Sequence, residues 1–357
     1  MIADRLLAWN AVPDSILRKI VRARVRRVQS SFDRLAPEDA EARETLLLER
    51  LESGPVTVCA EDANRQHYEV PPAFFALTLG PWFKYSCCYW PDGVADLARA
   101  EELMLELTAE RAGLSDGQSV LDLGCGWGSF ALWAAERYPH SRILAFSNSD
   151  PQRRHIEQRA RQRGLDNLRV ATGDVSSFAP AERFDRVVSV EMLEHVRNHK
   201  VLFERIAGWL SPSGLFFAHV FCHRKHLYAY ELDGEASWMT EHFFSGGIMP
   251  SWDYLTRYGE SLSLVDRWQV EGSHYAKTLR AWLVNLDRSR NDVLPVLRHT
   301  YGPEQARLWL AYWRIFFIAC EETFALDEGR SYFVGHYLFE AARGVGGGTA
   351  SSESRRS

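Results

Sequence analysis

The sequence predicts an α/β fold, a Rossmann-like doubly wound sheet, and two features support this prediction. A short apolar run at 120–123 breaks into the glycine-rich turn 124–128 and continues as an apolar helix, which is the pattern of a buried strand, a turn and a helix start. Further apolar runs of strand length follow, separated by helical segments, at 142–146, 168–171, 184–190 and 215–221. This alternation builds a parallel sheet with ligands at the carboxyl ends of its strands.

Composition narrows the class of protein. The 357 residues are 46% hydrophobic and 25% charged, which is ordinary for a globular enzyme with a large core. The formal net charge of −5 gives no sign of nucleic-acid binding. The six cysteines show neither a C-x-x-C pair nor a zinc spacing, so we expect no metal site and reduced thiols in a cytoplasmic protein. No uncharged run reaches about 18 residues, so no transmembrane helix is predicted.

A helical N-terminal segment is expected at 1–66. Residues 13–15 (Pro-Asp-Ser) form a helix start, and apolar residues then recur at helical spacing through 16–28. Basic residues lie between them: Arg18, Lys19, Arg22, Arg24, Arg26 and Arg27. Such a helix either lies on an anionic membrane surface or covers a core with its charges in water. A second, acidic helix is expected at 37–52.

The main domain is predicted at 67–343. Its first part is rich in aromatic residues, notably at 79–90, and forms either a packed core strand or the lid of a pocket. A helix is expected at 97–112. Residues 222–343 are expected to form a helical cap over the substrate, and the Gly- and Ser-rich tail 344–357 to be disordered.

The glycine turn is a candidate nucleotide loop. Gly124, Gly126 and Gly128 let the backbone turn sharply and let a ligand lie against it. The spacing is not the G-x-G-x-x-G of dinucleotide folds, and no P-loop Lys-Ser/Thr follows. With Asp122, the D-x-G-C-G-x-G string resembles the first motif of class I methyltransferases that use S-adenosylmethionine (SAM). A plain turn in another α/β sheet is the alternative.

Polar residues after the next two strands are further candidates for this cofactor. Ser147 and Gln152 follow the second strand and are suited to ribose or methionine contacts. Asp150 reads as a helix N-cap with proline after it. Asp174, followed by Val175, ends the third strand, where it either accepts from the adenine amino group or forms a turn.

The fourth strand is followed by two carboxylates and an imidazole. Glu191, Glu194 and His195 lie on one side if this turn is helical, and crowded carboxylates raise a pKa toward neutrality and make a usable base. The alternative is a charge cluster at a helix start. His219, near the end of the fifth strand, either faces the same cavity or is a satisfied core residue.

Several strings occur in a fixed order: Tyr85-Ser86-Cys87, the glycine turn, Ser147 with Gln152, Glu194-His195, 244–251 and 274–278. Together they resemble the cyclopropane-fatty-acid synthase superfamily of SAM-dependent methyltransferases, over roughly 65–340. The likeness is greater to its coclaurine N-methyltransferase branch, through strings such as 85–89, 191–195 and 311–319. The resemblance implies the class I methyltransferase fold, SAM as cofactor, and Tyr85 and Ser86 among its contacts.

The two branches imply different acceptors. In the lipid branch a bound bicarbonate is the base, and the positions that hold it correspond here to Cys87, Glu194, His219 and Tyr275, with Phe221 where the family has isoleucine. In the amine branch a glutamate stands where the lipid enzymes have glycine, and this glutamate is Glu191.

The resemblance therefore favours methyl transfer to a small-molecule amine, with Glu194 and His195 as base and Glu191 attracting the cation. An aromatic pocket is expected from Trp238, Tyr312, Trp313, Phe316 and Phe317. The aromatics at 312–317 also fit an amphipathic core helix, which is the alternative. Cyclopropane-type transfer to an unsaturated fatty-acyl lipid is the alternative. A SAM-binding module without turnover is disfavoured, because the glycine turn and the Glu/His cluster are both intact.

Overall fold

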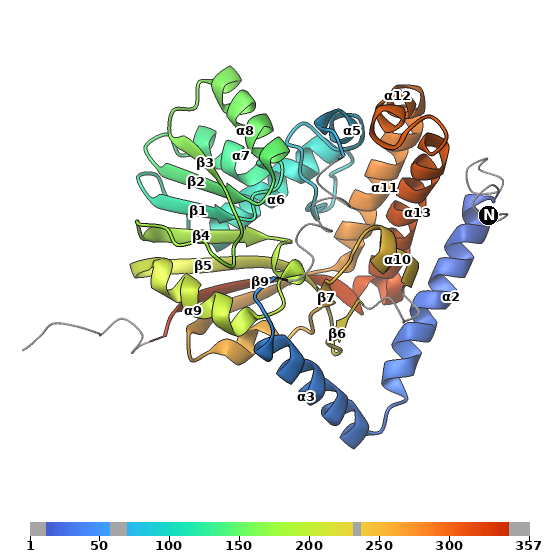
Figure 1. Cartoon of the computed structure of the whole chain (residues 1–357), viewed down its shortest axis with the longest axis horizontal. Coiled ribbons are helices and arrows are strands. Elements are labelled where there is room, and N and C mark those ends of the chain that lie inside the picture. The colour runs from blue at the N-terminus through green and yellow to red at the C-terminus, as the bar shows by residue number, and fades with distance from the viewer. Residues whose placement is uncertain (1–11, 58–69, 231–236, 343–357) are drawn as a thin grey trace, which may run out of the picture.

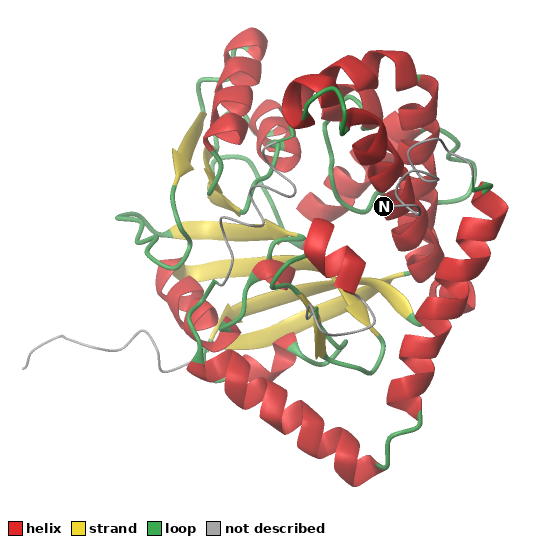
Figure 2. Cartoon of the chain, turned by 45° about the vertical axis from the view of Figure 1, so that its right-hand side comes forward, coloured by secondary structure: helices red, strands yellow, loops and turns green. Residues whose placement is uncertain are grey.

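The computed structural model describes residues 12–57, 70–230 and 237–342, whose centre is a seven-stranded sheet with helices on both faces (Figures 1 and 2). The strand order is β3 (Leu168–Thr172), β2 (Arg142–Ser147), β1 (Ser119–Leu123), β4 (Phe184–Val190), β5 (Leu210–His223), β9 (Tyr332–Ala341) and β8 (Leu262–Val270). The first five are parallel, and β9 runs antiparallel to both of its neighbours. This confirms the predicted doubly wound sheet.

Strands β8 and β9 were not predicted. Both lie in the region assigned to the substrate cap, so this region supplies sheet strands as well as helices. Strand β8 is mostly polar and half-exposed at the edge of the sheet, which hides its periodicity. Strand β9 carries buried histidine, glycine and tyrosine in place of the aliphatic run typical of a central strand.

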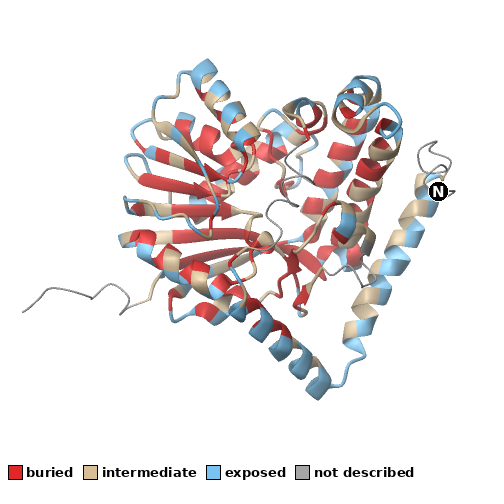
Figure 3. Ribbon diagram, viewed as in Figure 1, coloured by how far each residue is buried: buried red, intermediate tan, exposed pale blue. Residues whose placement is uncertain are grey.

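Two sets of helices cover the sheet. One face is covered by α6 (Leu97–Arg111), α7 (Ser129–Arg137) and α8 (Asp150–Arg163), which pack on side chains such as Val120, Val188 and Phe217. The other is covered by α3 (Pro37–Ser53) and α9 (His199–Trp209), with the 3-10 turn η3 (Leu255–Tyr258). Figure 3 shows the buried residues concentrated on the strands between these layers.

A helical cap lies beyond the carboxyl ends of the parallel strands (Figure 1). It has its own apolar core and confirms the predicted cap. Its elements are α5 (Pro72–Thr78), α10 (Ser237–His242), α11 (Gly272–Arg288), α12 (Arg290–Tyr301), α13 (Ala306–Phe324), the 3-10 turn η4 (Leu326–Gly329) and the small hairpin of β6 (Tyr228–Ala229) and β7 (Ile248–Met249).

The N-terminal helix α2 (Asp14–Asp33) is docked on α13 by ion pairs. Arg18 donates to Glu321 at 2.8 Å and to Glu322 at 2.9 Å, and Arg22 donates to Glu322 at 2.7 Å. None of the α2 residues is buried, and half-buried residues alternate with exposed ones along the helix (Figure 3). The helix therefore covers the protein, as in the second interpretation, but Arg18 and Arg22 point to buried carboxylates of α13 rather than into water.

Two details qualify the sequence predictions. Helix α8 is capped by Ser149, whose Oγ accepts from the N–H of Gln152 at 3.4 Å, so Asp150 is the first helical residue rather than the cap. The predicted disordered tail 344–357 lies outside the described residues.

Within the part of the chain that the structure describes, no helix has both the length and the apolar character needed to cross a bilayer.

Candidate active site

The predicted cofactor residues gather where β1, β2 and β3 end. The glycine turn follows β1 with positive φ angles of 81° at Gly124, 53° at Gly126 and 82° at Gly128, which favour glycine. A Cβ on Gly124 would lie 2.4 Å from Met192, and one on Gly128 would lie 2.6 Å from Ile156. A Cβ on Gly126 would meet nothing within 4 Å, so Gly126 keeps the backbone open to a ligand.

Oδ2 of Asp122 and Nε2 of Gln152 are buried beside this turn and have no hydrogen-bond partner among the described residues. The same holds for Nε1 of Trp127 in the turn itself. The Oε1 of Gln152 accepts from the hydroxyl of Ser147 at 2.6 Å, so its amide nitrogen is left for a ligand. Burial raises the pKa of Asp122 to about 7, opposed by the N–H of Ala131. SAM carries ammonium, carboxylate and hydroxyl groups that match these atoms, so the residues present fit the cofactor.

The other predicted cofactor residues differ in their surroundings. Tyr85 stacks near Trp282, with ring centroids 5.4 Å apart, and lines the adjoining pocket. Ser86 is buried and accepts a hydrogen bond from the ammonium of Lys84. Asp174 is exposed and accepts from the N–H of Ser176 at 2.7 Å, the turn contact given above as its alternative role, and Val175 is buried.

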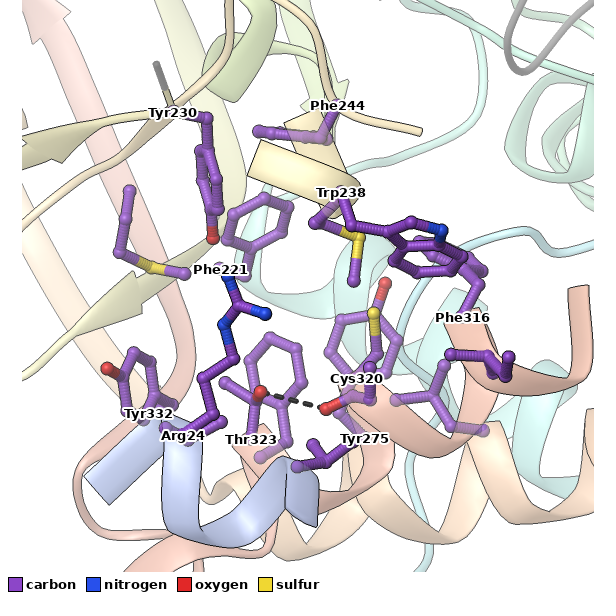
Figure 4. Close-up of a pocket in the computed structure, with 18 of the residues that line it drawn as sticks. Arg24, Phe221, Tyr230, Trp238, Phe244, Tyr275, Phe316, Cys320, Thr323 and Tyr332 are labelled. Atoms are coloured by element: carbon purple, nitrogen blue, oxygen red, sulfur yellow. Dashed lines mark hydrogen bonds between the residues drawn. The ribbon is translucent and has the colours of Figure 1, made fainter. Parts of the chain in front are cut away.

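A cavity of about 440 Å³ lies between α2, the cap and the end of β4 (Figure 4). Its walls are mostly aromatic and aliphatic, and Arg24 projects from α2 toward Phe221. It is lined by Leu17, Ile20, Val21, Arg24, Val25, Val28, Tyr85, Glu191, His195, Phe221, Tyr228, Tyr230, Trp238, Met239, Phe244, Met249, Tyr275, Leu279, Trp282, Ile315, Phe316, Ala319, Cys320, Thr323, Phe324 and Tyr332. This volume suits a small organic acceptor.

Only some of these wall residues were predicted from the sequence. Trp238 and Phe316 line the cavity as expected, whereas Trp313 and Phe317 are fully buried in the core of the cap. Tyr312 is also buried and is not among the lining residues of the described chain. The wall supplied by α2 was missed, although its apolar stripe at helical spacing was the available signal.

Glu191 is the acidic group that faces the cavity, and its carboxylate is held by three donors. Oε1 accepts from the N–H of Cys87 at 2.8 Å and lies 3.1 Å from Nε2 of His219. Oε2 accepts from the hydroxyl of Tyr275 at 2.5 Å. Burial raises the pKa of Glu191, while the ammonium of Lys84 and the donated hydrogen bonds lower it. Three donors and a nearby cation favour the ionised carboxylate.

The backbone of Glu191 is in a conformation rare for a residue with a side chain. Its φ is 47°, in the left-handed region that glycine favours. The turn that follows is a short 3-10 helix, Leu193–His195, so Glu191 precedes the helical residues. The expectation that a helical turn would place all three polar side chains on one side is therefore wrong.

Glu194 points into the protein. It is fully buried and is not among the cavity-lining residues of the described chain. Its Oε1 accepts from the N–H of Phe221 at 2.7 Å, and its Oε2 has no hydrogen-bond partner among the described residues. Burial and the charge of Glu191 raise the pKa of Glu194 well above its usual range, so it is the protonated partner of the pair.

The two histidines of the prediction have different places. His195 lines the cavity beside Phe244, with ring centroids 4.7 Å apart. His219 is fully buried behind Glu191 and reaches the cavity only through that carboxylate. Among the described residues, no three His, Cys, Asp or Glu side chains gather into a group that could hold a metal ion.

The sequence is similar to those of known methyl-transferring and cyclopropane-forming enzymes. The sequence model of the family described as mycolic acid cyclopropane synthetase matches residues 57–330. The chain is 33% identical to (S)-coclaurine N-methyltransferase of Thalictrum flavum subsp. glaucum over 94% of both chains. It is 31% identical to cyclopropane-fatty-acyl-phospholipid synthase of Escherichia coli (strain K12), but over 61% of this chain and 55% of that protein.

The structural comparison points in the same direction. A crystal structure of coclaurine N-methyltransferase, bound to N-methylheliamine and SAH, superposes with a TM-score of 0.90. The sequences are 32% identical, and the match covers 95% of this chain and 98% of the other. The likeness therefore includes the N-terminal helix and the cap as well as the sheet.

Proposed function

Because this chain belongs to the mycolic acid cyclopropane synthetase family and is a SAM-dependent methyltransferase, we propose that it transfers the methyl group to the nitrogen of a cyclic amine. The relatives that match nearly its whole length include (S)-coclaurine N-methyltransferase, whereas the lipid enzyme matches only part of it. An aromatic cavity with one ionised carboxylate in its wall is suited to a cationic ring amine.

One observation distinguishes the amine from the lipid acceptor. The resemblance assigns Cys87, His219 and Tyr275 to a bound bicarbonate in the lipid enzymes. In this protein all three contact the carboxylate of Glu191. A carboxylate has the charge and the planar pair of oxygens of bicarbonate, so Glu191 supplies from the chain the base that the lipid enzymes take from solution.

The backbone supports the same interpretation. Glu191 stands where the lipid branch has glycine, and its φ of 47° is the conformation that glycine favours. Retaining a side chain there costs about 1 kcal/mol or more in backbone strain. Strain of this kind is stored where function requires the residue, and here the side chain fills an anion site.

The reaction follows from these positions. SAM, when bound, supplies an electrophilic methyl group on a positively charged sulfur. Glu191 attracts the ammonium form of the amine and accepts its proton, which frees the nitrogen lone pair for the new N–C bond as the C–S bond breaks. His195, in the same wall, is placed to take the proton onward, and the aromatic walls keep water from the reacting atoms.

This assignment changes the roles expected from the sequence. Glu194 was expected to act as base together with His195. Its burial and raised pKa make it a neutral support whose Oε1 fixes the main chain at Phe221. We therefore propose Glu191 as the base, with Glu194 holding the wall behind it.

The test is methyl transfer from labelled SAM to a panel of cyclic secondary and tertiary amines, with unsaturated phospholipid vesicles as the competing acceptor. We expect product with amines and loss of product in Glu191→Gln. Transfer only to phospholipid, with Glu191→Gly fully active, would overturn the proposal.

The membrane contact through residues 16–28 and the cytoplasmic location stay predictions. Ile16 is 48% exposed, is not among the cavity-lining residues of the described chain, and lies near the exposed Lys19 on α2. Co-sedimentation with anionic vesicles, compared between the native chain and an Ile16→Ser/Lys19→Ser variant, tests the contact. Equal binding by both would remove it.

A further inference from the structure

Glu191 is the inner end of one hydrogen-bonded chain of four polar side chains that crosses the sheet. Nη1 of Arg111 lies 2.8 Å from Nδ1 of His336, and Nε2 of His336 lies 3.0 Å from Nδ1 of His219. Nε2 of His219 lies 3.1 Å from Oε1 of Glu191. The chain thus runs from the end of α6, through β9 and β5, to the cavity wall.

The sheet register brings these groups together. His219 and His336 are direct partners across β5 and β9, and Trp268 is the partner of His336 across β8 and β9. Directly opposed residues share a face of the sheet, which here is the face covered by α6. The guanidinium of Arg111 lies over the Trp268 ring, 5.1 Å from its centroid, and this contact fixes the outer end of the chain.

The direction of every hydrogen bond follows from Arg111. A guanidinium only donates, so Nδ1 of His336 must be the acceptor. A neutral His336 then carries its proton on Nε2 and donates to Nδ1 of His219. A neutral His219 in turn carries its proton on Nε2 and donates to Glu191.

We propose that Arg111 is a positioning residue, which through His336 and His219 fixes the imidazole tautomers so that an N–H always faces the Glu191 carboxylate. The role of Glu191 as base rests on the proposed function. The tautomers of His219 and His336 do not depend on that function, because they follow from the hydrogen bonds alone. Without Arg111, the Glu191 carboxylate alone would hold the pair in this order. The reversed order, in which a nitrogen lone pair faces the carboxylate, would then cost less.

Burial supports neutral imidazoles. His219 and His336 are both 0% exposed. Burial lowers the pKa of each well below its usual range, and the charges of Lys84 and Arg111 act in the same direction. Around Arg111, the nearby ionisable groups are Tyr89, Glu110 and Asp266.

The groups that face Glu191 come from several elements. They are Lys84 and Cys87 from the loop after α5, Tyr275 from α11, His219 from β5, Cys320 from α13 and Glu194 from its own turn. Because Arg111 cannot accept a proton, the chain cannot carry one away from Glu191. The proton from the amine therefore leaves on the cavity side, where His195 lies.

The direct test is ¹⁵N NMR of the full-length protein with labelled histidine, with signals assigned through His219→Gln and His336→Gln. We expect both imidazoles to be neutral with the proton on Nε2. In Arg111→Met the two should become tautomer mixtures, and in Arg111→Lys, which still donates, the Nε2–H forms should persist. A proton on Nδ1 of either histidine in the native protein would overturn the proposal, whether or not an amine is ever found to be methylated.

Kinetics supply the second readout, on an amine acceptor. Loss of one donated hydrogen bond to a charged group should lower kcat/KM about tenfold in Arg111→Met and move the acid limb of its pH profile to higher pH. The matched control is Arg99→Met, because Arg99 is an exposed arginine on the same helix that pairs with Glu102 and Glu106. If Arg111→Met matches Arg99→Met in the tautomers and in the acid limb, Arg111 is only structural and the proposal fails.

Discussion

The hydroxyl of Tyr275 donates a 2.5 Å hydrogen bond to Oε2 of Glu191, across 84 residues of sequence. Tyr275 comes from α11 of the cap, and Glu191 follows strand β4 of the sheet. This hydrogen bond therefore links the cap to the sheet in the wall of the cavity. It also gives the carboxylate a donor on the side away from the main chain.

Removal of the Glu191 side chain should leave an empty anion site that a small anion can fill. We expect Glu191→Gly to lose methyl transfer by roughly 10²- to 10⁴-fold, the usual contribution of a general base. Added acetate or bicarbonate should restore part of the rate, because Cys87, His219 and Tyr275 remain as donors. Glu191→Gln is the control, since its side chain still fills the site and should prevent rescue. Equal response of the two variants to added anion would contradict this account.

The two glutamates should respond differently to the same substitution. Glu194 is the protonated member of the pair, so Glu194→Gln replaces one neutral group by another of the same shape. We expect kcat/KM to fall by no more than about threefold, the effect of one neutral hydrogen bond. Glu191→Gln should fall by more than about a hundredfold. Both variants are measured at one pH with one amine. A larger loss of kcat/KM in Glu194→Gln than in Glu191→Gln would show that Glu194 is the base.

Cofactor affinity should depend on pH through Asp122. Burial raises the pKa of this carboxyl to about 7, so in the free protein it is protonated below that pH and ionised above it. Binding of the positively charged SAM favours the ionised form, so the Kd measured by calorimetry should fall as the pH rises toward about 7 and then level off. The change should approach tenfold per pH unit at most.

The same ionisation should affect stability in the opposite direction. A carboxyl whose folded pKa is raised stabilises the protein below its unfolded value of 3.8, and this stability is lost as the pH rises through about 7. Asp122→Asn should therefore raise the melting temperature of the SAM-free protein at pH 8 and flatten the pH dependence of SAM binding. A variant with unchanged melting temperature and an unchanged pH profile would contradict a buried Asp122 with a raised pKa.

Helix α2 should control access of the acceptor. Its apolar side lines the cavity, and Arg18 and Arg22 hold it to the buried Glu321 and Glu322. In Arg18→Met/Arg22→Met we expect the KM for the amine to rise roughly tenfold, equivalent to about 1.4 kcal/mol of docking energy, with SAM affinity unchanged.

The control for this prediction is Arg26→Met, an exposed arginine of the same helix. The KM of the native protein should also rise with ionic strength, since partly exposed ion pairs are screened by salt. If the double variant and Arg26→Met show the same KM for the amine, the ion pairs that dock α2 on α13 do not control access to the cavity, and the prediction is wrong.

The sequence predicted the features that local patterns determine. The five parallel strands, the glycine turn and helices α2, α3, α6, α7 and α8 follow from hydrophobic periodicity and turn chemistry, and the structure confirms them. Strands β8 and β9 were missed because an antiparallel edge carries mixed polarity, and because Gly335 and His336 interrupt the apolar run of β9. The pairing of β9 with β5 also joins residues more than 100 positions apart.

The residues of the candidate site were predicted from the sequence, but the directions of their side chains were not. Glu191, Glu194 and His195 were all identified, yet which of them faces the cavity depends on the φ of Glu191, which periodicity does not reveal. The wall formed by α2 required knowing that the helix docks on α13. Arg111 and His336 carry no motif, and only the register of β5 with β9 brings them to the base.

The central claim is that a carboxylate of the chain replaces bicarbonate as the base for an amine acceptor. Its most direct measurement is the rate of methyl transfer from labelled SAM in bicarbonate-free buffer, with and without added bicarbonate, to a cyclic amine and to unsaturated phospholipid. The account predicts that the amine is methylated at the same rate in both buffers, and the phospholipid in neither. Transfer to phospholipid that appears only when bicarbonate is added would contradict it.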